Sequence, residues 1–392
     1  EIRLSLVGSE MCIRDSNLGL FMVMQKWKLF AAVVVLICAC ADENRSNFST
    51  GELEFLKTFS GKAVFLSDYQ SPGRVVFFDD HLRSLEVPAH RDSRLRWVSE
   101  QHRLYVIQRL ESDSYFSIGF KDLTVRKEVS TLRGKNIQDL LPISETEAWV
   151  SAYNATSVAR IDLRTGEVLS HVGLNRDEID PDGASEPTYL TRIGNFFAAT
   201  FQNLNAFVPD RSPSIVVWSL DERVQTRAAA SRWKNPVTEF KLYDGVVYLG
   251  FAGVIQNGEV KDGGILQLDG TTFNPVRAVM TEEALRGDIV DFEIISASLG
   301  VAIVSKPKDG NTFSRLLLFD PSKGTVLDSP YVLASGYDFM QVLWDAKAGE
   351  IFLTDRNRKS PSIRVFDSQL NEKANRTIRL PAPPIQIIDV GN

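Results

Sequence analysis

Short apolar runs with a period of two, separated by polar turns, recur from about residue 60 to the C-terminus. The clearest example covers residues 147–172, EAWVSAYNATSVARIDLRTGEVLSHV. It contains a half-apolar segment, a polar tip, an alternating segment that ends in Asp, a Thr-Gly turn and a third alternating segment. This order predicts three antiparallel strands. A second copy, EIFLTDRNRKSPSIRVF, occupies residues 350–366.

Seven strands of this type end in Asp or a small residue, and successive ends lie between 40 residues (Asp79 to Gly119) and 57 residues (Asp162 to Ser219) apart. Further apolar runs, such as PVTEFKLY from Pro236, precede them. Four short strands at this period predict an all-β fold, a seven-bladed β-propeller of four-stranded antiparallel sheets over residues 61–392. The first unit lacks an upstream run, so we expect PPIQIIDV at 383–390 to close the ring beside Ala63.

The segments WVSAYNATSVARIDLRTGEVLSHV and FLTDRNRKSPSIRVFD resemble the YVTN-type β-propeller repeat, a bacterial seven-bladed family. The resemblance extends over about residues 62–390. Units two and four depart from it, because Gly119 and Ser219 stand where Asp is usual. The resemblance implies a secreted or lipid-anchored binding protein, and it implies no activity by itself.

The N-terminal part carries export signals. Residues 1–16 resemble translated sequencing-adapter readthrough, so we treat residues 1–23 as an artefact or non-native leader, with a genuine but disordered leader as the alternative for residues 1–16. Residues 24–39 contain two Lys and an apolar run of 11 residues, which predicts a lipoprotein signal peptide too short to span a bilayer. Ala39 before Cys40 resembles a lipobox, so we expect lipidation of Cys40, with an ordinary cleaved signal as the alternative. Ala41 favours the outer membrane, and residues 40–60 predict a tether.

Composition excludes several kinds of chemistry. The three Cys lie at positions 12, 38 and 40, so the propeller has neither a disulfide nor a Cys-ligated metal or thiol nucleophile. The four His are scattered, and we therefore expect no metal set built from them. The net charge is −6 without a basic cluster, which disfavours nucleic acid as a partner.

Long loops interrupt the repeat at residues 173–186, 202–213, 252–263 and 306–314. In a propeller, loops between the second and third strands share one face with the connections between units. We therefore expect one looped rim that binds a ligand or partner, with neutral loop growth as the alternative. Its candidate residues are Asn203, Asn205, Phe207, Asp210, Arg211, Trp233, Gln256, Asn257, Lys261, Asp262, Lys308 and Asp309.

One rim loop has the alternating oxygen ligands of a calcium loop. The hypothetical ligands are Asp177, Glu178, Asp180, Asp182 and Glu186. Pro181 interrupts the pattern, and the alternative is a solvated acidic turn. No other cofactor is expected.

These patterns predict a lipid-anchored cell-envelope propeller that acts as a binding or scaffold protein. Its expected partners are the membrane, through the lipid, and a protein, small molecule or glycan at the rim. The sequence offers no catalytic constellation. The alternative is an enzyme of the lactonase or quinoprotein type, and convergent carboxylates, His or Asn at the channel mouth would favour a lactonase.

Overall fold

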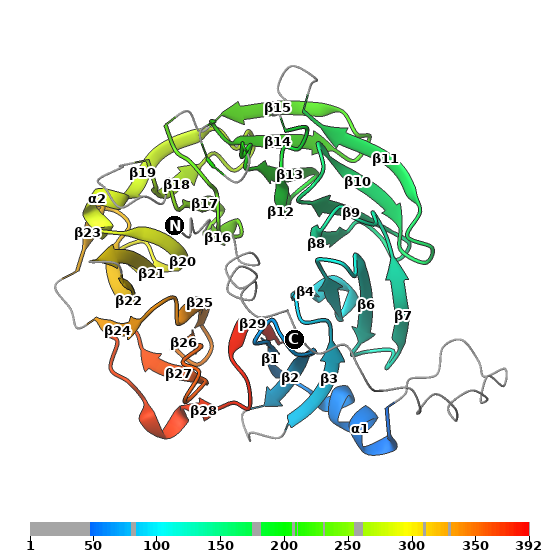
Figure 1. The fold of residues 1–392 in the computed structure, drawn as a ribbon, viewed down its shortest axis with the longest axis horizontal. Coiled ribbons are helices and arrows are strands. Elements are labelled where there is room, and N and C mark those ends of the chain that lie inside the picture. The colour runs from blue at the N-terminus through cyan, green and yellow to red at the C-terminus, as the bar shows by residue number, and fades with distance from the viewer. Residues whose placement is uncertain are drawn as a thin grey trace, which may run out of the picture.

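The computed structural model describes residues 48–79, 84–174, 182–205, 208–209, 211–229, 232–254, 262–308, 311–327 and 331–391. Its strands form seven antiparallel sheets that stand around a central channel (Figure 1). This arrangement confirms the predicted seven-bladed β-propeller.

The first three blades, from the channel outward, have four strands each. Blade one contains β29 (Pro384–Val390), β1 (Gly61–Leu66), β2 (Gly73–Asp79) and β3 (Ser84–Ala89). Blade two contains β4 (Ser93–Val98), β5 (Arg103–Gln108), β6 (Ser114–Gly119) and β7 (Val125–Ser130). Blade three contains β8 (Ile137–Pro142), β9 (Glu147–Ala152), β10 (Ser157–Asp162) and β11 (Val168–Gly173).

The remaining blades follow the same order, with one extra strand in blade six. Blade four contains β12 (Pro187–Ile193), β13 (Phe196–Phe201), β14 (Ser214–Ser219) and β15 (Val224–Ala229). Blade five contains β16 (Lys241–Tyr243), β17 (Val246–Phe251), β18 (Gly264–Leu268) and β19 (Pro275–Thr281). Blade six contains β20 (Asp288–Ser296), β21 (Leu299–Lys308), β22 (Asn311–Asp320) and β23 (Thr325–Val326), and β24 (Val332–Ser335) also pairs with β22. Blade seven contains β25 (Phe339–Asp345), β26 (Glu350–Asp355), β27 (Ser362–Asp367) and β28 (Ile378–Arg379).

The hydrophobic core lies between blades. Both faces of a blade are buried: on β2, Phe77 packs toward blade two, whereas Val76 and Phe78 pack toward blade seven. Trp149 and Trp218 pack edge to face between blades three and four, with ring centroids 5.2 Å apart. These two Trp side chains therefore serve the packing between blades.

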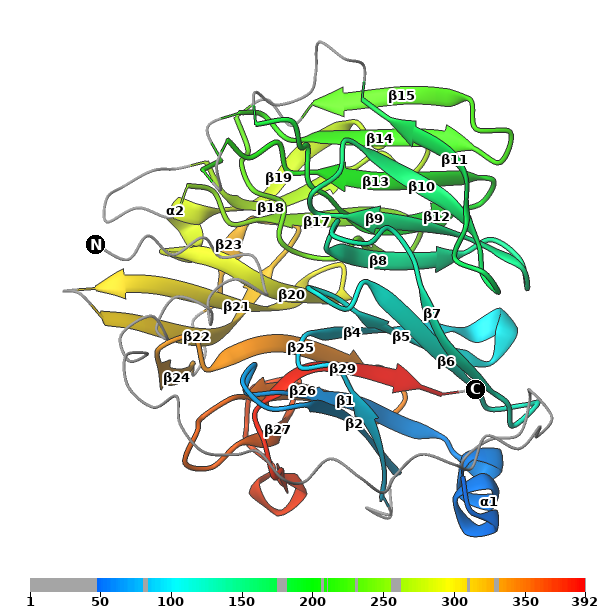
Figure 2. The ribbon, with the colours of Figure 1, turned by 45° about the vertical axis from the view of Figure 1, so that its right-hand side comes forward.

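The C-terminal strand closes the ring, as the sequence predicts. β29 pairs antiparallel with β1, from Gly61 opposite Val390 to Leu66 opposite Pro384. The ammonium of Lys62 adds ion pairs to Asp345 (2.7 Å) and Asp389 (3.2 Å). The first and last parts of the propeller are therefore joined within one sheet (Figure 2).

Helix α1 (Thr50–Thr58) corrects the predicted tether. Ser49 and Glu52 form a capping box at its N-terminus. Leu56 and Phe59 are buried against blades one and two, so the chain from Phe48 onward belongs to the folded domain. The other helices are short: α2 (Glu282–Leu285) and the 3-10 turns Ser99–Gln101 and Ala374–Arg376. Among the described residues, no helix has the length and apolarity needed to cross a membrane.

Candidate functional site

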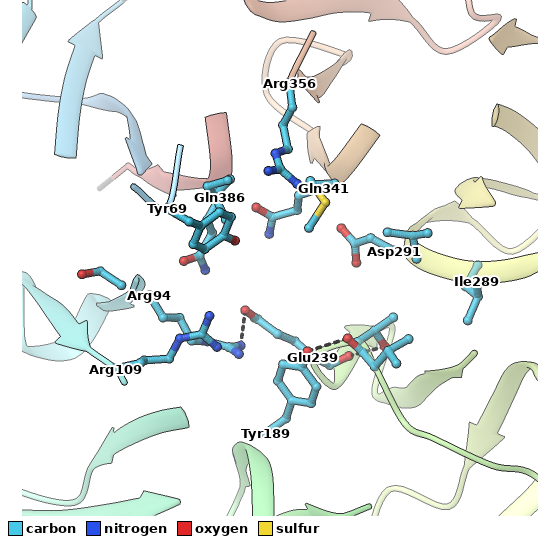
Figure 3. A pocket seen from close by; sticks show the side chains of 16 residues that line it. Tyr69, Arg94, Arg109, Tyr189, Glu239, Ile289, Asp291, Gln341, Arg356 and Gln386 are labelled. Atoms are coloured by element: carbon cyan, nitrogen blue, oxygen red, sulfur yellow. Dashed lines mark hydrogen bonds and ion pairs between the residues drawn. The ribbon is translucent and has the colours of Figure 1, made fainter. Parts of the chain in front are cut away.

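A cavity of about 150 Å³ lies at one mouth of the channel (Figure 3). Residues from six blades line it, at the starts of the inner strands and on nearby loops. Tyr69, Arg109 and Arg356 come from loops between second and third strands. The mouth therefore opens on the face for which the sequence predicts the looped rim.

Seven equivalent positions form a ring near the starts of the inner strands, and in each blade a polar residue precedes an apolar one. The polar residues are Gln386, Arg94, Asp139, Tyr189, Glu239, Asp291 and Gln341, in blade order. An inner strand has no neighbour on its channel side, so backbone N–H groups at that edge need another acceptor.

Four ring side chains supply this acceptor to the next blade. The Gln386 side-chain oxygen accepts from Leu95 N at 2.6 Å, and the Gln341 oxygen accepts from Ile387 N at 2.6 Å. The carboxylates do the same: Asp139 accepts from Leu190 N (2.9 Å), and Asp291 accepts from Val342 N (3.0 Å). These four residues thus link adjacent blades.

Arg94, Tyr189 and Glu239 depart from this role and lie together (Figure 3). Arg94 Nη2 lies 2.5 Å from Glu239 Oε1, so the ion pair joins blades two and five. The Arg94 guanidinium also lies 4.5 Å from the centroid of the Tyr189 ring. The Tyr189 hydroxyl donates to the Val237 carbonyl at 2.5 Å. In the described part of the chain, these three side chains do not accept a hydrogen bond from the backbone of the next blade, so that role does not explain their presence in the ring.

Buried charges next to the trio are paired. Asp139 is fully buried and receives hydrogen bonds from Arg96, including Nε at 2.9 Å. Burial would raise the pKa of Asp139, but Arg96 and Arg94 outweigh it and lower that pKa. Lys241 Nζ lies 2.8 Å from Glu293 and 3.5 Å from Asp291.

The pKa values of the two cavity carboxyls shift in opposite directions. Burial raises the pKa of Asp291 to about 6, although Lys241 opposes the shift. Burial would also raise the pKa of Glu239, but Arg94 and Lys241 outweigh it and lower that pKa. Burial would lower the pKa of Arg94, whereas Glu239 and Asp139 more than compensate and raise it. The Arg94–Glu239 pair is therefore charged at neutral pH.

The two other cavity arginines have different surroundings. Arg109 donates to the Asp92 carboxylate at 2.6 and 3.0 Å and to the Gln138 side-chain oxygen at 2.9 Å. Its guanidinium is thus held by the scaffold. Arg356 lies over the Tyr69 ring, 5.5 Å from its centroid.

The cavity hydroxyls are occupied by backbone groups. Ser93 Oγ donates to the His90 carbonyl at 2.9 Å. Thr238 Oγ1 donates to the Glu239 carbonyl at 3.0 Å and accepts from Gly250 N at 2.8 Å. In the part of the chain that the structure describes, no group of three or more His, Cys, Asp or Glu could hold a metal ion. The arrangement is suited to binding a polar molecule through paired charges.

The predicted calcium ligands Asp177, Glu178 and Asp180 lie outside the described residues. Asp182 Oδ1 accepts from Ala184 N at 3.0 Å, which is a local turn contact. Glu186 is buried and its Oε2 accepts from Leu204 N at 2.8 Å, so it ties two rim loops together. Calcium binding stays a prediction.

Several of the predicted rim residues also lie outside the described residues, namely Phe207, Asp210, Gln256, Asn257, Lys261 and Asp309, and Lys308 ends β21. Asn205 forms an isolated bridge with Val208, and Arg211 follows in the same loop. Asn203 is buried and donates to the Ser212 carbonyl at 2.9 Å. Asp262 Oδ1 accepts from Val254 N at 2.9 Å.

Trp233 requires a correction. It is buried between blades four and five, and its ring centroid lies 6.0 Å from that of Phe251. Its indole therefore supports the core instead of facing a ligand on the rim.

The sequence reasoning missed the ring at the channel mouth. A usable signal was present, because PVTEFKLY and DIVDFEII each place an acidic residue directly before a buried-type Phe. The same polar–apolar step in every unit marks the ring.

No protein-family model and no curated protein matches this chain. Among solved structures, a 6-phosphogluconolactonase-like protein from Bacteroides uniformis superposes with a TM-score of 0.57 at 10% identity, covering 84% of this chain and 99% of that chain. AztD from Citrobacter koseri gives a TM-score of 0.53 at 12% identity, covering 85% and 99%. Dihydro-heme d1 dehydrogenase NirN in complex with DHE gives 0.55 at 14% identity, covering 85% and 76%. At such identities, the likeness establishes that this chain has the β-propeller fold.

Proposed function

We propose that the protein is a binding protein of the cell envelope whose ligand is a small polar molecule held in the channel mouth. One observation carries the proposal: the three ring positions that do not cap a neighbouring blade, Arg94, Tyr189 and Glu239, meet in one cavity. Ligand sites are typically hollows in rigid scaffolds, with a few convergent polar groups.

The energetics support a functional reading of this trio. A buried ion pair loses much of its Coulomb energy to desolvation, so it is weak evidence for a stabilising role. Polar side chains of the kind found at the other ring positions would cap a strand edge and avoid a buried guanidinium. The trio therefore fits a site that is kept for binding.

Anchoring to the envelope is part of the proposal. The signal-like residues 24–39 and the lipobox-like step at Cys40 support a lipid anchor in the outer membrane. Metabolic labelling with palmitate tests it: the exported chain should become labelled, and Cys40→Ser should abolish the label. Equal labelling of both chains would contradict the anchor.

The strand ends that flank the predicted rim loops lie on the same face as the cavity. In the proposal, these loops bind a protein or glycan around the mouth. In this proposal, the rim surrounds the small-molecule site and extends it.

A lactonase-type enzyme is the second candidate. Glu239 and Asp291 line the same cavity and their pKa values shift in opposite directions, as in acid–base pairs. A 6-phosphogluconolactonase-like protein shares the fold. The assay is hydrolysis of 6-phosphogluconolactone, and a rate equal to that in buffer alone would remove this candidate.

The binding function is tested by a thermal-shift screen of amino acids, sugars, carboxylates and phosphorylated metabolites against the full exported chain. We expect at least one compound to raise the melting temperature, and Arg94→Gln to reduce that rise. Arg160→Gln is the matched control, because Arg160 forms ion pairs with Glu147 of blade three and Glu222 of blade four and does not line the cavity. Stabilisation that persists equally in Arg94→Gln would place binding elsewhere and contradict the proposal.

A further inference from the structure

Most charges around the cavity are paired with a charge of the opposite sign, whereas Arg356 lies over the Tyr69 ring. Arg94 is paired with Glu239, and Asp291 lies beside Lys241, which also holds Glu293. Arg109 is neutralised by the buried Asp92. The cavity is therefore lined by both signs of charge without a large excess of either.

The two members of the Arg94–Glu239 pair differ in exposure. The Arg94 side chain is 10% exposed, whereas the Glu239 side chain is 39% exposed. Arg94 Nε has no hydrogen-bond partner and lies 3.9 Å from Asp139 Oδ1. The buried guanidinium is thus held mainly through its Nη2 contact with Glu239.

This pairing restricts which ligands fit. A ligand with only negative charge would take Arg94 and leave Glu239 next to another cavity carboxylate, Asp291. A ligand with only positive charge would take Glu239 and leave the buried Arg94 with Asp139, 3.9 Å from its Nε, as its remaining carboxylate neighbour. Either exchange breaks the close Arg94–Glu239 pair, and the more distant Asp139 and Lys241 replace the lost partner only in part. This loss is unfavourable, above all for the buried Arg94.

We infer, on the basis of the proposed binding function, that the ligand is a small zwitterion with a carboxylate and an ammonium group. Its carboxylate binds Arg94 and its ammonium binds Glu239, so that one ion pair becomes two and every charge keeps a partner. The Tyr189 and Tyr69 rings line the same cavity and already hold the Arg94 and Arg356 guanidinium groups against them. An amino acid or a methylated amino acid has this chemistry.

The size of the cavity limits the size of the zwitterionic ligand. A cavity of about 150 Å³ is the size that holds benzene, so there is room for roughly six to eight non-hydrogen atoms. Val237, Ile289, Met340 and Ile385 supply apolar wall beside the charges. A small or medium aliphatic side chain fits this wall.

Isothermal titration of the full exported chain tests the inference. The probes are the aliphatic L-amino acids, L-proline and glycine betaine, each compared with a carboxylic acid that lacks the amino group and an amine that lacks the carboxylate. For L-valine these are isovalerate and isobutylamine. We expect at least one zwitterion to bind ten or more times tighter than both of its single-charge analogues, since a charge-assisted hydrogen bond is lost with each.

Two variants test separately the contact of the ligand ammonium with Glu239 and that of the ligand carboxylate with Arg94. Glu239→Gln should reduce the preference for the zwitterion over its carboxylic acid, and Arg94→Gln should reduce the preference over its amine, each by about tenfold. Arg160→Gln should change neither. Circular dichroism confirms that each variant is folded, and the double exchange Arg94→Glu with Glu239→Arg restores the opposite charges if a single variant unfolds.

The outcomes distinguish this inference from the proposed function. Carboxylic acids, amines or neutral sugars could bind in an Arg94-dependent way while zwitterions bind no tighter than these compounds. In that case the proposed small-molecule function stands, and the inference of a zwitterionic ligand is wrong. If nothing binds in an Arg94-dependent way, both are wrong.

Discussion

At the scale of single residues, Asp139 shows that one charged side chain at the channel can both link two blades and neutralise an arginine. One carboxylate caps the edge of blade four at Leu190 and neutralises Arg96 of blade two. Because Asp139 is fully buried, its removal would leave an unpaired guanidinium and an uncapped N–H group.

We therefore predict that Asp139→Ala lowers the free energy of unfolding by about 3–5 kcal/mol, the usual effect of breaking a buried pair. Urea denaturation followed by tryptophan fluorescence measures it. Glu86→Ala is the control, because the Arg74–Glu86 pair is about half exposed on both sides and exposed pairs contribute at most about 1 kcal/mol. A loss for Asp139→Ala as small as that for the control would contradict the role assigned to Asp139.

A second residue-scale prediction concerns pH. Burial, a hydrogen bond with Glu282 and repulsion from Glu282 and Asp262 raise the pKa of Asp288 to about 8. The folded state thus binds this proton more tightly than the unfolded chain, whose Asp has a pKa of about 3.9. The stabilisation that results is fully present below about pH 4 and is lost as the pH rises towards 8.

Replacing Asp288 with Asn removes this titration. We expect Asp288→Asn to unfold at higher denaturant concentration than the wild type at pH 8.5, by at least about 1 kcal/mol in free energy. Its stability should also fall less between pH 5 and pH 8. Asp320→Asn is a useful contrast, since hydrogen bonds from Ser322 lower the pKa of Asp320 to about 2, and loss of this carboxylate should destabilise at neutral pH. Parallel pH profiles for wild type and Asp288→Asn would contradict the assignment.

Sequence could locate single site residues only in part. Glu239 and Asp291 stand out because each precedes a Phe in an alternating run. Their partners do not, because the contacts cross the ring: Arg94 and Glu239 are 145 residues apart, and Gln386 and Leu95 are 291 apart. The repeat defines equivalent positions, and only the closed ring shows which of them meet.

At the scale of elements, the Asp residues that end strands stabilise the turns that follow. Asp162 Oδ1 accepts from the N–H groups of Arg164 and Thr165 at 2.7 and 3.0 Å. Blade two reaches the same result differently. Gly119 replaces the Asp, and a side chain there would meet Asp122 Oδ1 at 1.8 Å, so Asp122 occupies the space and accepts from Thr124 N. A degenerate repeat unit can thus preserve its turn.

The stretch 306–314 was predicted as a rim loop but is mainly a hairpin. β21 extends to Lys308, and β22 begins at Asn311, with Lys308 opposite Asn311. The charged and Pro-containing flank suggests a loop, yet the Asp-Gly pair between the strands favours a two-residue hairpin. Turn chemistry here outweighs the low hydrophobicity of the strands.

Helix α1 is expected to contribute to the stability of the propeller. Leu56 is 1% exposed and packs with Phe59 on the core shared by blades one and two. Leu56→Ala should cost about 2–4 kcal/mol through lost burial and a cavity. Glu54→Ala on the exposed face of the helix should change stability by no more than about 0.5 kcal/mol. If differential scanning calorimetry shows equal melting temperatures for the two variants, the helix is not an integral part of the domain.

At the scale of the whole molecule, the period of the strands was enough to predict the ring and its closure. Each of seven core clusters spans two adjacent blades, so no blade buries its faces alone. The same logic makes the last strand indispensable. β29 places Ile387 in the core against blade seven and Val390 in the core against blade two, and Gln386 caps the edge of blade two.

Truncation of this strand tests ring closure. Removing residues 384–392 would expose the edge of β1 and open two core clusters, so we expect loss of the cooperative melting transition and association through the free edge. Size-exclusion chromatography with light scattering and thermal circular dichroism measure these effects. Removal of 391–392 alone is the control and should leave a monomer-to-oligomer ratio and melting temperature like those of the full chain. If the nine-residue truncation melts within a few degrees of the control, the six complete blades and the open first blade stay folded without β29. The structure of the channel mouth would then not depend on ring closure.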